Sequence, residues 1–515
     1  MRDQYRDHES VSPFHDPQDA PHILTSVYRA PLEHFQTLQM TVGSSGSPWW
    51  IKACRVAVAA LFVAPRLVYD IECHGLERVV GGKRTYFAIS HKRDLDSFLP
   101  LPLLLGRRGW RALTEEVHFA TRADAFTPGF LARLIQRPAW LSRLLHPINV
   151  GPIIHALGAH PIESLHARPL EEWIREALYE DPEAAHSQIG ATLAPPLIHA
   201  LAQAAGETDA QVEQAPLAQA LAWRYHSALV RWYGPELFTE DARRRAEWRV
   251  VREVKRQIND IAQWFQQGGS LYSAPEGRLS PTGRLSAIAS GFHRLLRQTP
   301  AGTRIVPIAL VYDTMTTGRP RLFVDVAEPI EEAMSLPVHE LDARLQSTWL
   351  SAMRFTCTQL ASGALIRLYV QTPDPEHQQG QQASAPVVTL DALTQTVHQW
   401  AQTLAERGRN VDRRLLRQRK ARRLVGGYIR YAERKGILLR VVRGQWVVSE
   451  TLPELEAPLG DVGYTQAPLA YAYNEFQEML SVDYAEVIAS PEIVAPPQEQ
   501  APLPGNAPTL SPPAS

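Results

Sequence analysis

The sequence predicts an α/β protein: a layered sheet with flanking helices and a helical insertion, followed by a small C-terminal α/β unit of winged-helix-like type. The chain has 515 residues. A single hydrophobic core rarely serves a chain of this length, so we expect two folded units. Short β-rich runs alternate with helical patterns, which is typical of a layered α/β sheet. Near the C-terminus, a helical stretch precedes two short strand-like runs around Gly444.

The larger unit contains five short runs with strand-like composition, and we expect each to be a strand. They are Thr85–Ile89, Val117–Ala120, Ser270–Tyr272, Arg304–Val311 and Arg321–Val326. A helical pattern over Arg244–Gln267 precedes the third strand. The mainly helical stretch from about 164 to 243 indicates an insertion between strands, and Pro138 should split the apolar segment Phe130–Leu145 into two helices.

Composition sets the expected domain boundaries. Residues 1–22 are predicted to be disordered, as is the Pro- and Ala-rich tail 490–515. Residues 372–386 are rich in Pro, Gln, Gly and Ser and should form a linker. The expected folded domains are therefore 23–371 and 387–489.

Charge and cysteine content exclude several classes of protein. The net charge of −1 gives no overall attraction to nucleic acid, so we expect no nucleic-acid partner. Cys54, Cys73 and Cys357 show neither even pairing nor zinc-ligand spacing, so we expect no disulfide framework and no metal site. The acidic N-terminus lacks the order of a secretory signal, which favours a cytoplasmic setting.

Membrane contact is expected to be peripheral or monotopic, on the cytoplasmic face. The apolar run Val56–Tyr69 is interrupted by Pro65 and is shorter than the roughly 20 residues of a spanning helix. It could lie at a bilayer interface or form a buried core helix. The basic amphipathic segment Phe130–Leu145 could lie on a membrane or be the ordinary solvated face of a soluble protein. The arginine-rich run 413–423 fits a solvated helix face, an anionic lipid surface or DNA.

The first chemical motif is His91 followed five residues later by Asp96. His91 comes directly after a predicted strand, where open α/β sheets place ligands. A turn after the strand would bring Asp96 to the imidazole. An imidazole oriented by a carboxylate can take a proton from an alcohol, so this pair predicts a general base and its orienting group.

The second motif, Pro275-Glu276-Gly277-Arg278, follows another predicted strand. Backbone amides freed by Gly277 and the guanidinium of Arg278 suit phosphate recognition. A carboxylate beside the phosphate would repel that phosphate. Glu276 is therefore expected to hold the loop in place rather than to contact the phosphate. Such a turn can also be purely structural.

Together, these motifs make the chain resemble the glycerol-3-phosphate and 1-acylglycerol-3-phosphate O-acyltransferase superfamily, whose signature is H-x-x-x-x-D followed by a block such as F-P-E-G-T-R-S. Further segments resemble family blocks in the same order, and a C-terminal segment resembles the longer glycerol-3-phosphate acyltransferase branch. The matching segments are His91–Asp96, Thr121–Asp124, Leu157–Ile162, Ala274–Ser280, Ser290-Gly291, Arg304–Leu310 and Leu469–Asn474.

The resemblance implies acyl transfer from acyl-CoA or acyl-carrier protein to a hydroxyl of glycerol-3-phosphate in phospholipid synthesis, with no cofactor beyond the acyl thioester. His91 and Asp96 would be catalytic. Glu276, Gly277, Arg278 and Arg122 would form the acceptor-phosphate site, with further contributions from Arg168 and Ser280.

Departures from the family pattern leave the acceptor open. Lys92-Arg93 follows His91 where the family often has Arg-Ser or Gln-Ser, Glu163 lies near a position where it often has arginine, and Leu279 follows Arg278 where it has the cation. Lysophosphatidate or dihydroxyacetone phosphate are therefore alternative acceptors. A non-catalytic lipid- or membrane-binding protein on the same fold is the alternative from another class. The absence of a G-x-S-x-G elbow and of a P-loop disfavours a serine hydrolase and a kinase.

Overall fold

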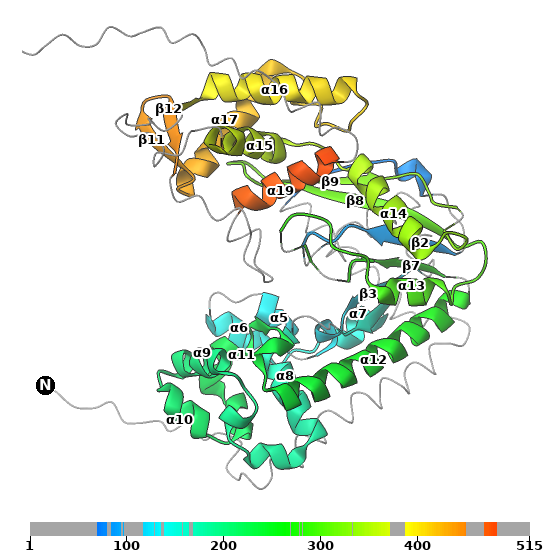
Figure 1. Cartoon of the computed structure of the whole chain (residues 1–515), viewed down its shortest axis with the longest axis vertical. Helices are drawn as coiled ribbons and strands as arrows, with labels where there is room; N and C mark the ends of the chain where they lie inside the picture. Colours follow the sequence, from blue (N-terminus) through cyan, green and yellow to red (C-terminus); the bar gives the residue numbers. More distant parts are fainter. Residues whose placement is uncertain are drawn as a thin grey trace, which may run out of the picture. The chain divides into compact units, whose positions relative to one another are not determined.

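The computed structural model in Figure 1 describes fourteen stretches of the chain in two compact units. The described residues are 69–79, 84–93, 96, 117–127, 129–134, 139–156, 158–163, 168–267, 269–277, 279–280, 282–331, 333–370, 387–449 and 468–481. The first unit includes the described residues up to 314 together with 319–354. The second includes 315–318, 355–449 and 468–481.

A seven-stranded sheet forms the centre of the first unit, with strand order β1-β9-β8-β2-β7-β3-β4. Strands β8, β2, β7, β3 and β4 run parallel to one another, β9 runs antiparallel to β8, and β1 runs parallel to β9. The strands are β1 Asp70–His74, β2 Thr85–Ile89, β3 Val117–Arg122, β4 Ala159–Ile162, β7 Ser270–Ser273, β8 Arg304–Asp313 and β9 Arg321–Val326. The five parallel strands therefore present their carboxyl ends at one edge of the sheet.

Burial explains why the central strands form where the sequence predicts them. Every residue of β2 and of β9 is buried, as is all of β8 after Arg304, so these apolar runs are covered on both faces. Trp349 donates its indole hydrogen to the carbonyl of Ala88 at 3.1 Å, which ties a helix to β2. The helices of this part are α5 Phe130–Leu134, α6 Ala139–Leu145, α7 Gly151–Ala156, α12 Glu240–Gln266, α13 Ser290–Leu296 and α14 Val338–Ala352.

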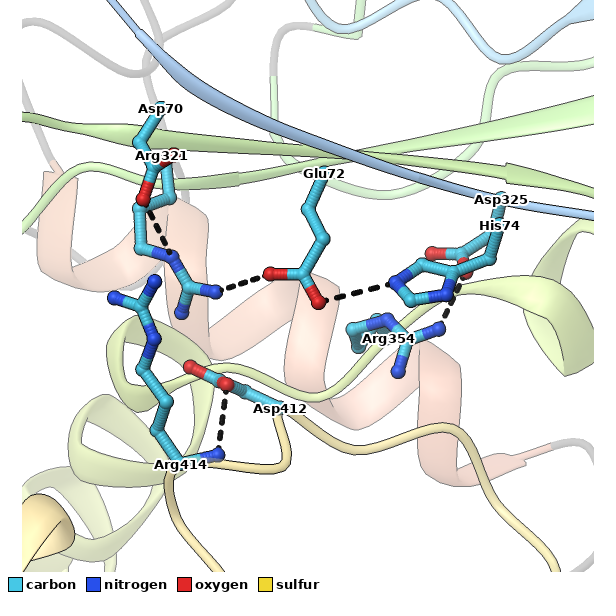
Figure 2. Close-up of polar contacts among 8 residues, drawn as sticks. All are labelled: Asp70, Glu72, His74, Arg321, Asp325, Arg354, Asp412 and Arg414. Carbon is cyan, nitrogen blue, oxygen red and sulfur yellow. Dashed lines mark hydrogen bonds and ion pairs between the residues drawn. The ribbon is translucent and has the colours of Figure 1, made fainter.

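Strands β1 and β4 were not predicted, and β1 shows why. Its sequence is charged, yet it pairs along the edge of the sheet with β9. Arg321 donates to Glu72 at 2.6 Å and lies 3.8 Å from Asp70, while Arg354 donates to Asp325 at 2.6 Å (Figure 2). Ion pairs therefore neutralise the charged side chains of β1, and it is these charged residues that kept β1 from being recognised as a strand in the sequence.

The predicted helical insertion is confirmed and has its own hydrophobic core, which includes Trp173, Leu197, Leu201 and Tyr225. Its helices are α8 Leu170–Glu180, α9 Pro195–Ala205, α10 Asp209–Gln214 and α11 His226–Leu229. Strands β5 Arg168–Pro169 and β6 Trp232–Tyr233 pair as a two-stranded antiparallel ribbon. The short 3₁₀ helices of the first unit are η1 Leu76–Arg78, η4 Ala123–Phe126, η5 Pro182–His186, η6 Ile189–Ala191, η7 Leu217–Leu221, η8 Trp223–Tyr225 and η9 Pro235–Leu237.

The second unit combines helices with a three-stranded antiparallel sheet of order β10-β12-β11. Its elements are α15 Cys357–Val370, β10 Val387–Thr389, α16 Leu390–Glu406, α17 Gln418–Arg434, β11 Leu438–Val442, β12 Gln445–Val448 and α19 Pro468–Ser481. The helix followed by a hairpin around Gly444 is the arrangement expected from the sequence.

The boundary between the units differs from the expected position near residue 371. Helix α15 belongs to the second unit, which includes all described residues from Phe355 onward. The ring of Phe476 on α19 lies 6.1 Å from that of Phe355 and stacks 5.6 Å from that of Trp400. The boundary before Phe355 therefore lies ahead of the segment 372–386 that composition singled out.

Several expectations concern residues outside the described part of the chain. These are the disordered ends 1–22 and 490–515, the linker 372–386, and all of Val56–Tyr69 except Tyr69. Among the described residues, no helix is long and apolar enough to cross a membrane. The described parts of Phe130–Leu145 form α5 and α6, and the hydroxyl of Ser142 donates to the carbonyl of Ala132 at 3.0 Å; Pro138 itself lies outside the described residues.

Candidate active site

The two sequence motifs meet at the carboxyl ends of adjacent strands. His91 follows β2, and Glu276 follows β7, its parallel neighbour. The backbone N–H of His91 donates to Oε2 of Glu276 at 2.6 Å, across 185 residues of sequence. The backbone N–H of Ser280 donates to the carbonyl of His91 at 3.1 Å. Two hydrogen bonds thus join the motifs into one site.

Glu276 acts as a clamp between loops. Its side chain is buried, and its second oxygen, Oε1, accepts from the backbone N–H of Ser286 at 2.6 Å. Burial raises the pKa of Glu276, while the charge of Lys92 and the two amide hydrogen bonds act in the opposite direction. Both oxygens are held by main chain, which fits the loop-holding role expected from the sequence.

The carboxylate of Asp96 is fully buried and accepts three hydrogen bonds. Oδ2 accepts from the backbone N–H groups of Lys92 at 2.5 Å and Arg93 at 2.6 Å. Oδ1 accepts from the hydroxyl of Tyr312 near the end of β8. The hydroxyl of Tyr272 on β7 donates to the backbone carbonyl of Asp96 at 2.7 Å. Asp96 is therefore fixed by its own turn and by two neighbouring strands.

The imidazole of His91 faces this carboxylate. Its Nδ1 lies 3.5 Å from Oδ2 of Asp96, and the His91 side chain is 10% exposed. Among the described residues, this buried Nδ1 has no hydrogen-bond partner. Catalytic hydrogen bonds are commonly long before substrate binds, so the distance fits an orienting contact that shortens on binding. With Nδ1 facing Asp96, Nε2 is the ring nitrogen left for substrate.

Tyr312 and Tyr272 were not identified from the sequence. Burial, and then the negative charge of Asp96, raise the pKa of both hydroxyls well above the usual value, so both remain protonated donors at neutral pH. The position of Tyr312 could have identified it, because this residue lies near the carboxyl end of β8, beside the strand that precedes His91.

Arg93 brings a positive charge to the same place. Its guanidinium lies 4.4 Å from the centre of the Tyr312 ring. It also donates to the hydroxyl of Tyr69 at 3.2 Å and to that of Thr314 at 3.5 Å. The departure from the family pattern after His91 therefore places a cation over the tyrosine that holds Asp96.

Ser280, Gly283 and Arg284 belong to a segment that is tied to the His91 motif. The buried Lys92 donates through Nζ to the carbonyl of Gly283 at 2.8 Å. The hydroxyl of Ser280 donates to the carbonyl of Arg284 at 2.5 Å and accepts from the N–H of Gly283 at 2.9 Å. Ser280, expected as an additional acceptor contact, thus uses its hydroxyl inside its own loop.

Gly277 closes the turn that contains Glu276. Its φ of 65° lies in the left-handed region that favours glycine, and its N–H donates to the carbonyl of Ala274 at 3.1 Å. That amide, expected to bind phosphate, is thus used within the turn.

The cations proposed from the sequence lie mostly outside what the structure describes. Arg278 is not among the described residues. For Arg122 and Arg168 only the backbone is described: Arg122 ends β3, beside β7, and Arg168 begins β5. In the part of the chain that is described, no group of three or more His, Cys, Asp or Glu residues is placed to hold a metal.

Comparisons with known proteins give limited similarity. No family model and no curated protein matches the sequence. Among solved structures, the chain is similar to the 1-acyl-sn-glycerophosphate (LPA) acyltransferase PlsC from Thermotoga maritima, with 11% sequence identity over 64% of this chain and 94% of that chain. The TM-score is 0.28, and a similarity of this size identifies neither a family nor an activity for this chain.

Proposed function

We propose that this protein is an O-acyltransferase that moves an acyl group from acyl-CoA or acyl-carrier protein to a hydroxyl of glycerol-3-phosphate. The observation that carries the proposal is the hydrogen bond from the His91 backbone to Glu276, which joins the two motifs of the acyltransferase pattern. Asp96, at 3.5 Å from the His91 ring, completes the arrangement of a base and its orienting carboxylate.

In the proposed reaction, the acceptor hydroxyl oxygen attacks the carbonyl carbon of the thioester while its proton moves to Nε2 of His91. Asp96 stabilises the imidazolium that forms. The C–S bond of the tetrahedral intermediate then breaks, and the proton passes to the departing thiolate. No covalent intermediate on the protein and no further cofactor is required.

For the acceptor phosphate, we propose Arg278 and Arg122 as ligands, with Arg168 as an additional cation. Support comes from position: Arg278 follows the Gly277 turn that is tied to His91, and Arg122 ends β3 at the same edge of the sheet. Glu276 and Ser280 act through the loops that they hold.

The test is a transfer assay with purified protein, a radiolabelled acyl thioester, and glycerol-3-phosphate, dihydroxyacetone phosphate or lysophosphatidate as acceptor. Among the three acceptors, we expect glycerol-3-phosphate to give the highest kcat/KM. A preference for another acceptor would assign that substrate instead. Absence of transfer to all three would support the non-catalytic, lipid-binding alternative.

The phosphate assignment has its own test. Arg278→Ala should raise the KM for the acceptor about tenfold or more, because a charge-assisted contact is lost. Arg284→Ala, an exposed arginine of the neighbouring loop, is the matched control and should leave that KM unchanged. An unchanged KM in Arg278→Ala would refute the assignment.

A further inference from the structure

The second unit concentrates positive charge in one segment of the chain. Residues 411–449 contain twelve lysines and arginines and two acidic residues, although the whole chain has a net charge of −1. Both acidic residues have basic neighbours: Asp412 accepts from the backbone N–H of Arg414 at 3.0 Å, and Glu433 accepts from Arg440 at 2.9 Å. The excess of basic residues in this segment attracts a polyanion.

Helix α17 presents much of this charge to solvent. Ala421, Val425, Tyr428, Ile429 and Ala432 are buried and recur at helical spacing, so one face of α17 packs against the unit. The exposed positions carry the basic residues, which are Arg419, Lys420, Arg422, Arg423, Arg430 and Arg434. Arg422 pairs with Asp391, while Arg419, Lys420 and Arg423 are further exposed cations in the first turns of the helix.

The adjoining sheet has an outer face on which aliphatic side chains stand beside the polar pair Thr389 and Gln445. Val387, Val447 and Leu439 are cross-strand partners and therefore lie on the same face. Val387 is 52% exposed and Leu439 is 50% exposed, whereas Val388 and Trp446 on the opposite face are buried. The solvent face of such a sheet is normally polar. Here it carries a row of aliphatic side chains.

The hairpin tip extends this apolar row beside further arginines. Val441 and Val442 are 57% and 52% exposed, at a bulge in β11 that precedes the turn. Arg443 stands at the turn, and Arg440 lies with its guanidinium 5.7 Å from the ring of Trp446. Strand β11 directly follows α17 and packs against it, so the cations and the aliphatic side chains belong to one continuous segment (Figure 1).

We propose that α17 and the outer face of the β10-β12-β11 sheet form a docking surface for a lipid bilayer that contains anionic phospholipids. Arginine and lysine bind the headgroup phosphates, while the aliphatic row enters the boundary between headgroups and acyl chains. The exposed aliphatic row favours a bilayer over a nucleic acid, because nucleic-acid phosphates offer it no apolar partner. This surface is independent of the proposed acyl transfer.

The experiment is sedimentation of the full-length protein with vesicles of phosphatidylcholine alone or of phosphatidylcholine mixed with phosphatidylglycerol. The wild type should bind the mixed vesicles, less tightly as salt rises, and bind phosphatidylcholine vesicles weakly. Substituting Arg419, Lys420 and Arg423 by Gln should weaken binding about 100-fold at low salt, since each basic residue near the surface contributes about fivefold.

Matched variants separate this surface from general effects of charge. Arg244, Arg252 and Lys255 are exposed on α12 in the first unit, and their triple substitution by Gln removes the same charge. It should leave binding unchanged. Arg419→Lys with Arg423→Lys keeps the charge and should bind like the wild type. Leu439→Asn with Val441→Asn should weaken binding about tenfold, including at high salt, where apolar contacts remain.

Three outcomes would overturn the proposal. In the first, the Gln triple variant of α17 binds vesicles as tightly as the wild type. In the second, the Gln triple variant of α12 loses as much vesicle binding as the α17 variant. In the third, the protein binds a double-stranded DNA oligonucleotide but not vesicles. The last would assign the surface to nucleic acid. The assay contains no acyl donor, so it can be interpreted whether or not the protein catalyses acyl transfer.

Discussion

At the scale of single residues, the geometry of the candidate site depends on how Asp96 is held. Its carboxylate receives two hydrogen bonds from its own turn and one from Tyr312, and faces His91. The sequence pointed to His91 and Asp96 because this pair comes directly after a predicted strand. It did not identify Tyr312, because a buried tyrosine near the end of a strand is indistinguishable in sequence from ordinary core packing.

Tyr312→Phe removes the hydroxyl that holds Oδ1 of Asp96. We expect kcat to fall about tenfold with little change in KM, because the orienting carboxylate is less well fixed, and the free energy of unfolding to fall by about 1–3 kcal/mol. Steady-state kinetics and urea unfolding measure the two effects.

The matched control for that variant is Tyr86→Phe. Tyr86 is equally buried, on β2, and its hydroxyl bonds Ser273 rather than Asp96. It should lose stability and retain kcat. Equal kcat values for Tyr312→Phe and the wild type would show that Tyr312 has no positioning role.

At the scale of elements, the strands that the sequence predicts are the five that have a neighbouring strand on each side in the sheet. The bounds of β2 and β9 agree with prediction, and β8 extends two residues beyond it. The edge strands β1 and β4 were missed, because a strand such as β1 is stabilised by pairing and by cross-strand ion pairs such as Arg321–Glu72, which local composition does not reveal.

Helix α8 is connected to the end of α6 through Glu171. Its carboxylate lies 3.2 Å from His146 and 2.7 Å from Arg175. Burial alone would raise the pKa of Glu171, but the His146 hydrogen bond and the charges of Arg175 and His146 lower it to about 2. Because the folded-state pKa lies below the ordinary value of 4.5, this contribution to stability is present above that value and is lost as the pH falls toward 2.

Glu171→Gln should therefore lower the free energy of unfolding by about 3 kcal/mol at neutral pH, with the difference from the wild type closing between pH 4.5 and about 2. Urea unfolding at a series of pH values measures this. Glu213→Gln on α10, where the side chain is exposed, should show no such pH-dependent difference. A difference that stays constant with pH would contradict the ion-pair account.

Two helix glycines should respond to alanine with opposite signs. A Cβ on Gly363 in α15 would lie 2.5 Å from the ring of Phe476, so Gly363→Ala should lower the free energy of unfolding of the second unit by about 1–3 kcal/mol. The nearest atom to a Cβ on Gly426 in α17 is 3.8 Å away, so Gly426→Ala should raise stability by about 0.5–1 kcal/mol. Thermal unfolding compares them, and changes of the same sign would refute this packing.

At the scale of the whole molecule, the sequence predicted the α/β class, the insertion and a separate C-terminal unit, but not the boundary of that unit. Composition located the segment 372–386, whereas the assignment of α15 depends on tertiary contacts such as that of Gly363 with Phe476. The junction of the two motifs could be anticipated only through their order and their place after strands, because the hydrogen bond from His91 to Glu276 spans 185 residues.

The boundary gives a prediction for isolated fragments. A fragment of residues 355–481 contains α15 and should unfold cooperatively. A fragment of residues 387–481 lacks Phe355 and α15, which pack against α19, so it should lose several kcal/mol of stability and its cooperative transition. Circular dichroism during thermal unfolding distinguishes them, and equal transitions would restore the boundary near residue 371.

In the proposed mechanism, His91 acts as the base for acyl transfer, oriented by Asp96 in a site that the Glu276 loop completes. The most direct measurement is the rate of transfer from a radiolabelled acyl thioester to glycerol-3-phosphate by wild-type protein, His91→Ala and Asp96→Asn. The account predicts transfer by the wild type, a loss of about 100-fold or more in His91→Ala, and a smaller but clear loss in Asp96→Asn. A His91→Ala protein that is folded and transfers acyl groups at the wild-type rate would contradict it.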